Sequence, residues 1–182
     1  MGKPNNPNGA NVIYIGGPCA TGKSTAANML SVKTGRRVFK LDKILNLVGG
    51  HGDTSEENEN ITRIIARALI EEMLATRTRC IVEGVWIKPD TSAELLDQYG
   101  SNYFPVYRGY SEAKAEERLR AITDNGAHWL ANKPGSEATA IIQKQIEEDS
   151  ILIRAEAIKY GLNYVDFSDQ SQGCEVLQQL FI

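Results

Sequence analysis

Residues 17–24 (GPCATGKS) have the composition and spacing of a phosphate-binding loop, G-x-x-x-x-G-K-[ST]. The apolar run 12–15 before them is typical of a buried strand, and residues 23–33 after them are typical of a helix. A strand, a glycine-rich turn and a helix N-terminus together direct backbone N–H groups and the helix dipole at an anion. Lys23 can place its ammonium over the terminal phosphates of a nucleotide, and the Ser24 hydroxyl can bind Mg²⁺. This context favours a nucleotide site over a chance match on a tight turn.

The expected nucleotide contacts extend slightly beyond the loop, into the first turn of the helix. The residues predicted to hold the phosphates are Gly17, Ala20, Thr21, Gly22, Lys23, Ser24 and Thr25. Cys19 lies among them, and two interpretations of it stand side by side. The helix N-terminus and Lys23 could lower the pKa of its thiol, or Cys19 is simply a small residue that fits the loop.

Apolar, β-branched runs alternate with helix-period segments along the chain. The strand candidates are residues 12–15, 37–41, 80–85, 103–107 and 163–167. The helix candidates are residues 23–34, 55–77, 90–99, 111–123, 136–160 and 171–181. This alternation predicts an α/β fold with a parallel sheet and helices on both faces. Asn-Gly and Pro-Gly turn signals mark residues 124–135, where a mobile lid is expected, and Ser111 is expected to open the helix before it.

Length and composition limit the class of protein. A chain of 182 residues with 42% hydrophobic and 24% charged residues is expected to form one domain, over residues 11–182, after a disordered leader of residues 1–10. The net charge of −3 without a basic block argues against broad nucleic-acid binding. No apolar run approaches a membrane span, and the first residues lack the apolar core of a secretory signal. Three dispersed cysteines indicate reduced thiols, so we expect a cytoplasmic protein without a membrane partner.

Carboxylates follow two of the predicted strands, where ligands collect in an open parallel sheet. Asp42 could orient or deprotonate a substrate hydroxyl that attacks the γ-phosphate, and this interpretation is preferred slightly over a helix-capping role. Glu83 could hold Mg²⁺ or grip the substrate. Equally, it could be a buried glutamate paired with a nearby arginine or lysine.

Phosphoryl transfer also needs cations around the moving charge. The candidates are Arg108, Arg118, Arg120, Lys133 and Arg154. Arg118 is the preferred one, because it lies shortly before the expected lid. Arg63 and Arg67 could bind an anionic acceptor, but their spacing to Glu71 slightly favours a surface salt-bridge ladder.

Taken together, these segments resemble the P-loop small-molecule kinases of the nucleoside-monophosphate-kinase-like superfamily. The strings are GGPCATGKST (16–25), LD (41–42), IVEGV (81–85), the segment 111–119 and YVDFS (164–168). The stretch IVEGVWIKP (81–89) is similar to the corresponding part of 2-phosphoglycerate kinase and related ATPase-like kinases.

The resemblance implies a three-layer P-loop NTPase fold, a five-stranded parallel sheet in the order 2-3-1-4-5 and a helical lid. It also implies ATP and Mg²⁺ as cofactors and a small-molecule acceptor. Asp42 matches a position used as base or substrate ligand, and Arg118 matches an arginine that contacts the nucleotide. The loop after Asp166 matches the segment beside the adenine.

Two functions therefore remain at this point. The leading one is an ATP-dependent kinase that phosphorylates a hydroxyl or phosphate of a small molecule, with Lys23, Asp42 and Arg118 as the catalytic residues. The alternative is a nucleotide-binding regulator or toxin-like P-loop protein that acts on a protein or a cell-wall precursor. Its motivation is the expected lid, which contains Lys133 but no arginine.

Overall fold

The computed structural model describes residues 7–44, 56–124 and 133–181. Its centre is a sheet of five parallel strands, β1 (Val12–Gly16), β2 (Arg37–Lys40), β3 (Cys80–Glu83), β4 (Tyr103–Gly109) and β5 (Asn163–Asp166). The strands are ordered β2-β3-β1-β4-β5, so the predicted parallel sheet and its order are confirmed. All five residues of β1 are buried, as expected for a central parallel strand that is covered on both faces.

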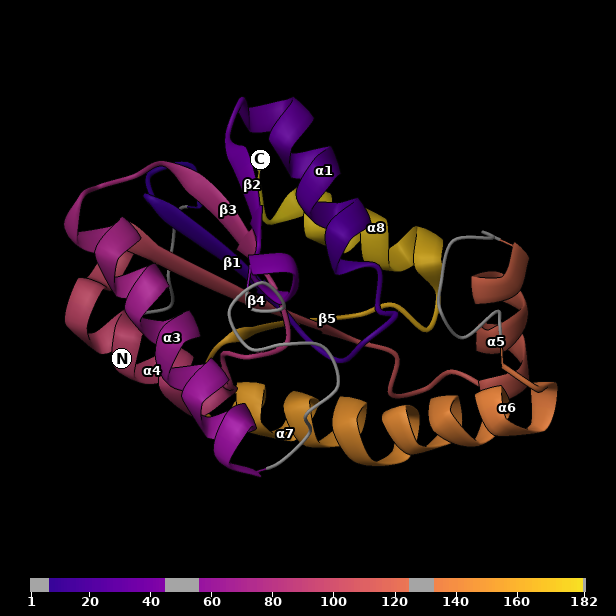
Figure 1. Cartoon of the computed structure of the whole chain (residues 1–182). Coiled ribbons are helices and arrows are strands. Elements are labelled where there is room, and N and C mark those ends of the chain that lie inside the picture. Colours follow the sequence, from indigo (N-terminus) through magenta and orange to yellow (C-terminus); the bar gives the residue numbers. More distant parts are fainter. Residues whose placement is uncertain (1–6, 45–55, 125–132, 182) are drawn as a thin grey trace.

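Helices cover both faces of this sheet (Figure 1). On one face lie α1 (Lys23–Thr34) and α8 (Gln170–Gln179), packed on Ile13 and Ile15. On the other lie α3 (Glu56–Ala75), α4 (Pro89–Tyr99) and α7 (Ile151–Lys159), packed around Tyr14. Successive side chains of β1 point to opposite faces of the sheet and therefore belong to two separate hydrophobic cores. A short 3₁₀ helix, Gly100–Asn102, leads into β4.

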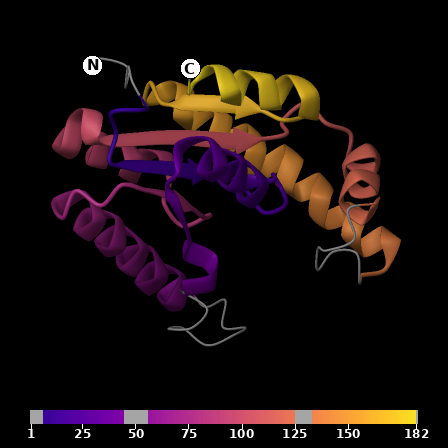
Figure 2. The same cartoon turned by 90° about the horizontal axis from the view of Figure 1, so that it is seen from above.

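Two further helices, α5 (Ala115–Asp124) and α6 (Gly135–Lys144), form a third apolar cluster with Tyr110. Both views place α5 beyond the end of the sheet (Figures 1 and 2). Most of the expected lid, residues 125–132, lies outside the described residues. Among the described residues, no helix has both the length and the apolar character needed to cross a bilayer.

Three segments differ in detail from what the sequence led us to expect. The helix expected from residue 111 begins at Ala115, because Ser111 instead bonds to β5. The helix expected over residues 136–160 is present as continuous helix over residues 135–159, with a π-helical segment at Gln145–Ser150 between α6 and α7. The expected disordered leader includes residues 7–10, but these form a turn that ends in the fully buried Ala10.

Candidate functional site

The loop of residues 17–24, here called the phosphate loop, turns through three residues with positive φ: Gly17 (136°), Ala20 (59°) and Gly22 (73°). A Cβ at Gly17 would lie 2.1 Å from the carbonyl oxygen of Arg108, so only glycine fits between this loop and β4. Thr21 is 1% exposed, and its Oγ1 donates a hydrogen bond to the Pro18 carbonyl at 3.0 Å. The loop is therefore held in shape by its own residues and by its contact with β4.

Three cationic side chains reach this loop from three different elements. Each donates a hydrogen bond to a different loop carbonyl: Lys23 Nζ to Pro18 at 2.7 Å, Arg118 Nη2 to Ala20, and Arg108 Nη1 to Gly22. Lys23 begins α1, Arg118 comes from α5, and Arg108 comes from the end of β4. Three loop carbonyls thus keep three cationic side chains beside the loop, where they would attract a phosphate group.

Burial acts on all three of these cations in the same direction. It lowers the pKa of Lys23, which is 6% exposed, and that of Arg118. Burial, with a smaller contribution from the like charge of Arg118, lowers the pKa of Arg108 to about 9. The charged forms of all three groups are therefore disfavoured by burial, and a bound anion would relieve that cost.

Two side-chain oxygens, from Ser24 at the start of α1 and from Glu83 at the end of β3, lie close together. Ser24 Oγ donates a hydrogen bond to Glu83 Oε1 at 2.7 Å, and Glu83 is 4% exposed. The pairing of Ile15 with Glu83 explains this contact, since it places the end of β3 beside the strand that leads into the loop. Hydroxyl and carboxylate oxygens are hard ligands of the kind that Mg²⁺ prefers, so the two residues fit this ion.

In the described parts of the chain, no group of three or more His, Cys, Asp or Glu side chains could hold a metal. An ion at Ser24 and Glu83 would therefore complete its coordination with phosphate oxygens and water. This is the usual arrangement for Mg²⁺ in nucleotide sites.

Asp42 follows β2 within a short helical stretch, residues 41–44. It therefore stands inside that stretch and not ahead of it, where a capping residue would lie. Its Oδ1 accepts a hydrogen bond from the Val85 backbone N–H at 3.4 Å, which places the carboxylate beside the segment that follows Glu83. Both carboxylates act on Lys23, whose pKa they raise against the effect of burial. The two strand ends thus bring Asp42 and Glu83 to the same edge of the sheet.

A buried cluster of tyrosines supports the segment after β3, and the sequence reasoning missed it. Tyr14 donates from its hydroxyl to the Gly84 carbonyl at 2.9 Å, and Tyr107 donates to the Ile87 carbonyl at 3.0 Å. Ser92 links the hydroxyls of Tyr107 (2.7 Å) and Tyr103 (2.9 Å). The available signal was the inward-facing tyrosines on two central strands, whose buried hydroxyls require partners.

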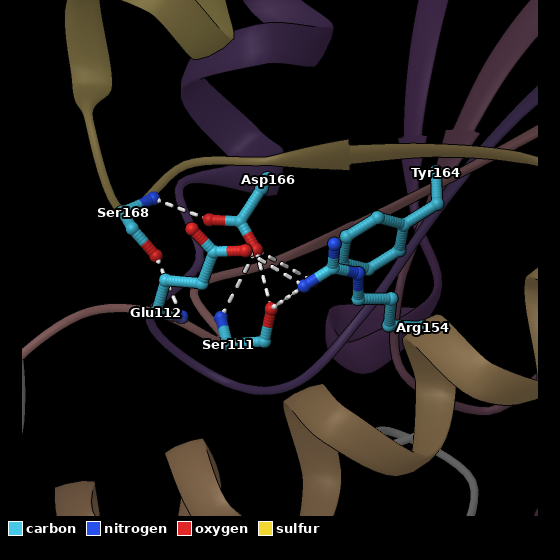
Figure 3. A network of polar contacts seen from close by, with 6 residues as sticks. All are labelled: Ser111, Glu112, Arg154, Tyr164, Asp166 and Ser168. Atoms are coloured by element: carbon cyan, nitrogen blue, oxygen red, sulfur yellow. Dashed lines mark hydrogen bonds and ion pairs between the residues drawn. The ribbon is translucent and has the colours of Figure 1, made fainter.

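Asp166, which was predicted near the nucleotide, lies at the centre of a polar network (Figure 3). Its Oδ2 accepts hydrogen bonds from the Ser111 N–H (3.1 Å), the Ser111 hydroxyl (2.6 Å) and the Tyr164 hydroxyl (3.2 Å). Its Oδ1 accepts one from the Ser168 N–H at 2.8 Å. Asp166 therefore fixes the loop after β5, and its carboxylate is already occupied by these donors.

Arg154, one of the candidate cations, belongs to the same network. It donates to the Ser111 hydroxyl at 3.2 Å and pairs with Glu112 at 2.9 Å. These contacts, drawn in Figure 3, join α7 to the segment between β4 and α5. Arg118 lies in α5, directly after that segment. Arg154 is thus held within the network by Ser111 and Glu112.

The remaining predicted residues lie on the surface. Arg67 pairs with Glu71 at 2.9 Å and with Glu94 at 2.6 Å, and Arg63 pairs with Glu59 at 3.1 Å. The surface salt bridge expected between Arg67 and Glu71 is therefore present. Arg120 and Thr25 are exposed, and Lys133 pairs with Glu137.

The environment of Cys19 does not lower the pKa of its thiol, which was one of the two interpretations of this residue. Burial raises the pKa of its thiol, and the opposing effect of Lys23 is smaller. The carbonyl of Cys19 accepts a hydrogen bond from the Tyr110 hydroxyl at 3.1 Å. A lowered thiol pKa at this position is therefore wrong.

Tyr110 is a residue beside the phosphate loop that the sequence did not reveal. The Cζ atom of Arg118 lies 5.1 Å from the centroid of its ring.

No protein-family model matches the sequence, and no curated protein matches it. Solved structures do match. A shikimate kinase from Bacteroides thetaiotaomicron is 16% identical, with 93% of this chain and 95% of that chain covered and a TM-score of 0.61. A shikimate kinase from Acinetobacter baumannii is 18% identical (94% and 90% covered, TM-score 0.59).

A gluconokinase from Sinorhizobium meliloti is also similar, at 15% identity with 95% and 90% covered and a TM-score of 0.58. The matched structures cover nearly the whole of this chain and are themselves nearly covered by it. At these identities the likeness concerns the fold. The chain therefore has the three-layer fold of the P-loop small-molecule kinases, as the sequence resemblance implied.

Proposed function

We propose that this protein is an ATP-dependent phosphotransferase that moves the γ-phosphate of ATP to a hydroxyl or phosphate of a small molecule. The observation that carries the proposal is the convergence of Lys23, Arg108 and Arg118 on one phosphate loop beside two carboxylates. Neighbours of the same fold that are named as shikimate kinase and gluconokinase support a small-molecule acceptor.

The residues of the site divide into those that hold the nucleotide and those that face the acceptor. The loop N–H groups and Lys23 bind the phosphates, and Ser24 with Glu83 would hold Mg²⁺. Mg²⁺, when bound, neutralises charge on the β- and γ-phosphates. Arg118 can exchange its bond to the Ala20 carbonyl for one to a phosphate oxygen, because its guanidinium carries several donors.

Asp42 serves the acceptor side. Its carboxylate lies beside the segment after Glu83 and would accept the proton of an acceptor hydroxyl, or orient that hydroxyl for in-line attack. For an acceptor that is already a phosphate, orientation alone is required. Arg63 and Arg67 contribute to an anionic acceptor only if they leave their carboxylate partners.

The test is ADP formation from ATP and Mg²⁺ with a panel of sugars, sugar acids, phosphorylated acids and nucleoside monophosphates. Lys23→Ala is expected to lower kcat/KM by about 100-fold or more, as expected for loss of a charge that stabilises the transition state. Asp42→Asn is expected to lower kcat by about 100-fold while ATP binding is kept. Lys33→Ala, at the exposed end of α1, is the matched control and should behave as wild type.

Unchanged turnover in Lys23→Ala would contradict the proposal. Tight ATP binding without turnover on any acceptor would favour the nucleotide-binding regulator instead.

A further inference from the structure

Arg108 is an unusual member of the site, because it is a buried cation that contacts the loop from strand β4. It is 4% exposed, and its Nη1 donates to the Gly22 carbonyl. Its Cζ lies 3.4 Å from the centroid of the Phe167 ring, so the guanidinium is stacked on that ring. Its Nε is buried without a hydrogen-bond partner among the described residues.

Among the described residues, no carboxylate forms an ion pair with Arg108. Besides burial, the groups that act on its pKa are the Cys174 thiol, which raises it, and the cation Arg118, which lowers it, and Lys23 is a further cation nearby. Gly22 also precedes the N-terminus of α1, where the helix dipole disfavours a cation. A buried charge without a counter-ion is strongly unfavourable, so this arrangement implies an anion that the chain itself does not supply.

We propose that the polyphosphate of the bound nucleotide is the counter-ion of Arg108, so that this residue couples phosphate binding to the stability of the fold. The inference rests on the polyphosphate-binding part of the proposed function, and it does not require turnover.

The geometry shows how this coupling would work. A Cβ at Gly22 would lie 3.3 Å from Arg108 Nη2, so the guanidinium lies against the residue directly before Lys23. The Phe167 ring occupies one of its faces and the loop lies against it elsewhere, so Arg108 acts through the loop as a positioning residue. It holds the Gly22 carbonyl, which also accepts the first hydrogen bond of α1 from Ala26. It also adds positive potential behind the N–H groups that face the phosphates.

The chain contains a matched control in Arg36. This arginine is also 4% exposed, also has a buried Nε without a partner among the described residues, and likewise has its pKa lowered by burial. It donates to the backbone carbonyls of Asn11 (3.0 Å), Asn8 (3.2 Å) and Pro7 (3.4 Å). Those carbonyls precede β1, whereas the phosphate loop follows it, so Arg36 lies at the other end of the sheet.

The experiment compares full-length wild type, Arg108→Met, Arg108→Lys, Arg108→Gln and Arg36→Met. For each protein, the Tm without ligand and the Kd for sodium tripolyphosphate and for ATP with Mg²⁺ are measured. Arg108→Met is expected to melt no lower than wild type without ligand, because an uncompensated charge is removed. It is expected to bind both ligands about tenfold or more weakly, because the favourable potential is lost. Arg36→Met should lower the Tm and leave both Kd values unchanged.

The two polar variants separate charge from shape. Arg108→Lys keeps the charge and should retain most of the affinity, whereas Arg108→Gln keeps a donor without the charge and should lose affinity as the Met variant does. If Arg108→Met does not fold, this pair decides the question. Equal Kd values for Arg108→Lys and Arg108→Gln would overturn the inference. So would an Arg108→Met protein that binds both ligands like wild type but has a lowered Tm, as expected for Arg36→Met. Wild-type binding without any turnover would count against the proposed function and leave the role of Arg108 intact.

Discussion

Ser24 Oγ and Glu83 Oε1 lie 2.7 Å apart, so a hydrogen bond joins the first turn of α1 to the end of β3. One residue belongs to the phosphate-loop motif and the other ends an adjacent strand, so sheet order alone brings them together.

The first prediction concerns this pair. Glu83→Gln is expected to weaken the apparent affinity for Mg²⁺ about 10–100-fold, since an amide is a poorer partner for the ion and for the Ser24 hydroxyl. A titration of ATP turnover with Mg²⁺ measures this change. Glu72→Gln, on the exposed side of α3, is the control. An unchanged Mg²⁺ dependence in Glu83→Gln would remove Glu83 from the metal site.

The second prediction compares two glycines with positive φ. Gly17→Ala would place a Cβ 2.1 Å from the Arg108 carbonyl, so the loop must deform and ATP binding should fall below detection. Gly35→Ala, at φ 69° with nothing within 4 Å of the added carbon, should cost only about 1 kcal/mol of stability. Calorimetric titration with ATP distinguishes them. Normal ATP binding by Gly17→Ala would mean that the loop tolerates a side chain there.

The third prediction is a pH dependence at Asp166. Burial tends to raise its pKa, but hydrogen bonds from Ser111 and Ser168 outweigh burial, so the pKa lies below its ordinary value. The stability that the carboxylate contributes is therefore present above the unfolded pKa of about 3.9 and is lost as the pH falls through the lower folded pKa. Asp166→Asn should cost about 1–2 kcal/mol at pH 7 and less at pH 3.

Urea unfolding at the two pH values checks this expectation. Asp97→Asn, on the exposed surface of α4, serves as the control. A cost for Asp166→Asn that is equal at both pH values would show that the network depends on shape and not on the charge.

The fourth prediction concerns the tyrosine cluster. Burial raises the pKa of Tyr107, so the native state keeps this proton above pH 10, where the unfolded chain releases it. Stability is therefore full below the unfolded pKa of about 10 and declines as the pH rises above it. Tyr107→Phe should cost about 1–2 kcal/mol at pH 8, because bonds to Ser92 and Ile87 are lost. Its decline above pH 10 should be shallower by up to about 1.4 kcal/mol per pH unit.

Guanidinium unfolding at pH 8 and pH 10.5 provides the measurement, with Tyr99→Phe on α4 as the control. Lys23, whose pKa is lowered, changes stability in the opposite sense in alkali, and it does so equally in both variants. An alkaline slope for Tyr107→Phe that equals the wild-type slope would contradict the assignment.

The sequence was informative where a property is local. The spacing of residues 17–24 predicted the loop, and the apolar runs predicted all five strands to within three residues. The position of Asp42 and Glu83 at the ends of neighbouring strands followed once the sheet was taken as parallel.

Properties that depend on contacts between distant segments could not be predicted from the sequence. Arg108 was recognised as a strand-end cation, but its stacking on Phe167 depends on how β4 and β5 pair. Ser111 was expected to open a helix, and it bonds to Asp166 instead, 55 residues along the chain. The π-helical segment at Gln145–Ser150 escaped notice because a one-residue change in hydrogen bonding hardly alters an apolar pattern.

The position of β1 at the middle of the sheet has a consequence for how such a protein can diverge. Strands β3 and β2 lie on one side of it, with Glu83 and Asp42, and strands β4 and β5 lie on the other, with Arg108 and the Asp166 network. Under the proposed function, the acceptor residue Asp42 and the nucleotide contacts of Arg118 and the Asp166 network therefore come from opposite sides of β1. Mutations around Asp42 that spare the phosphate loop and Glu83 can exchange one acceptor for another without disturbing the residues that hold ATP, so a change of substrate need not pass through a protein that has lost its nucleotide.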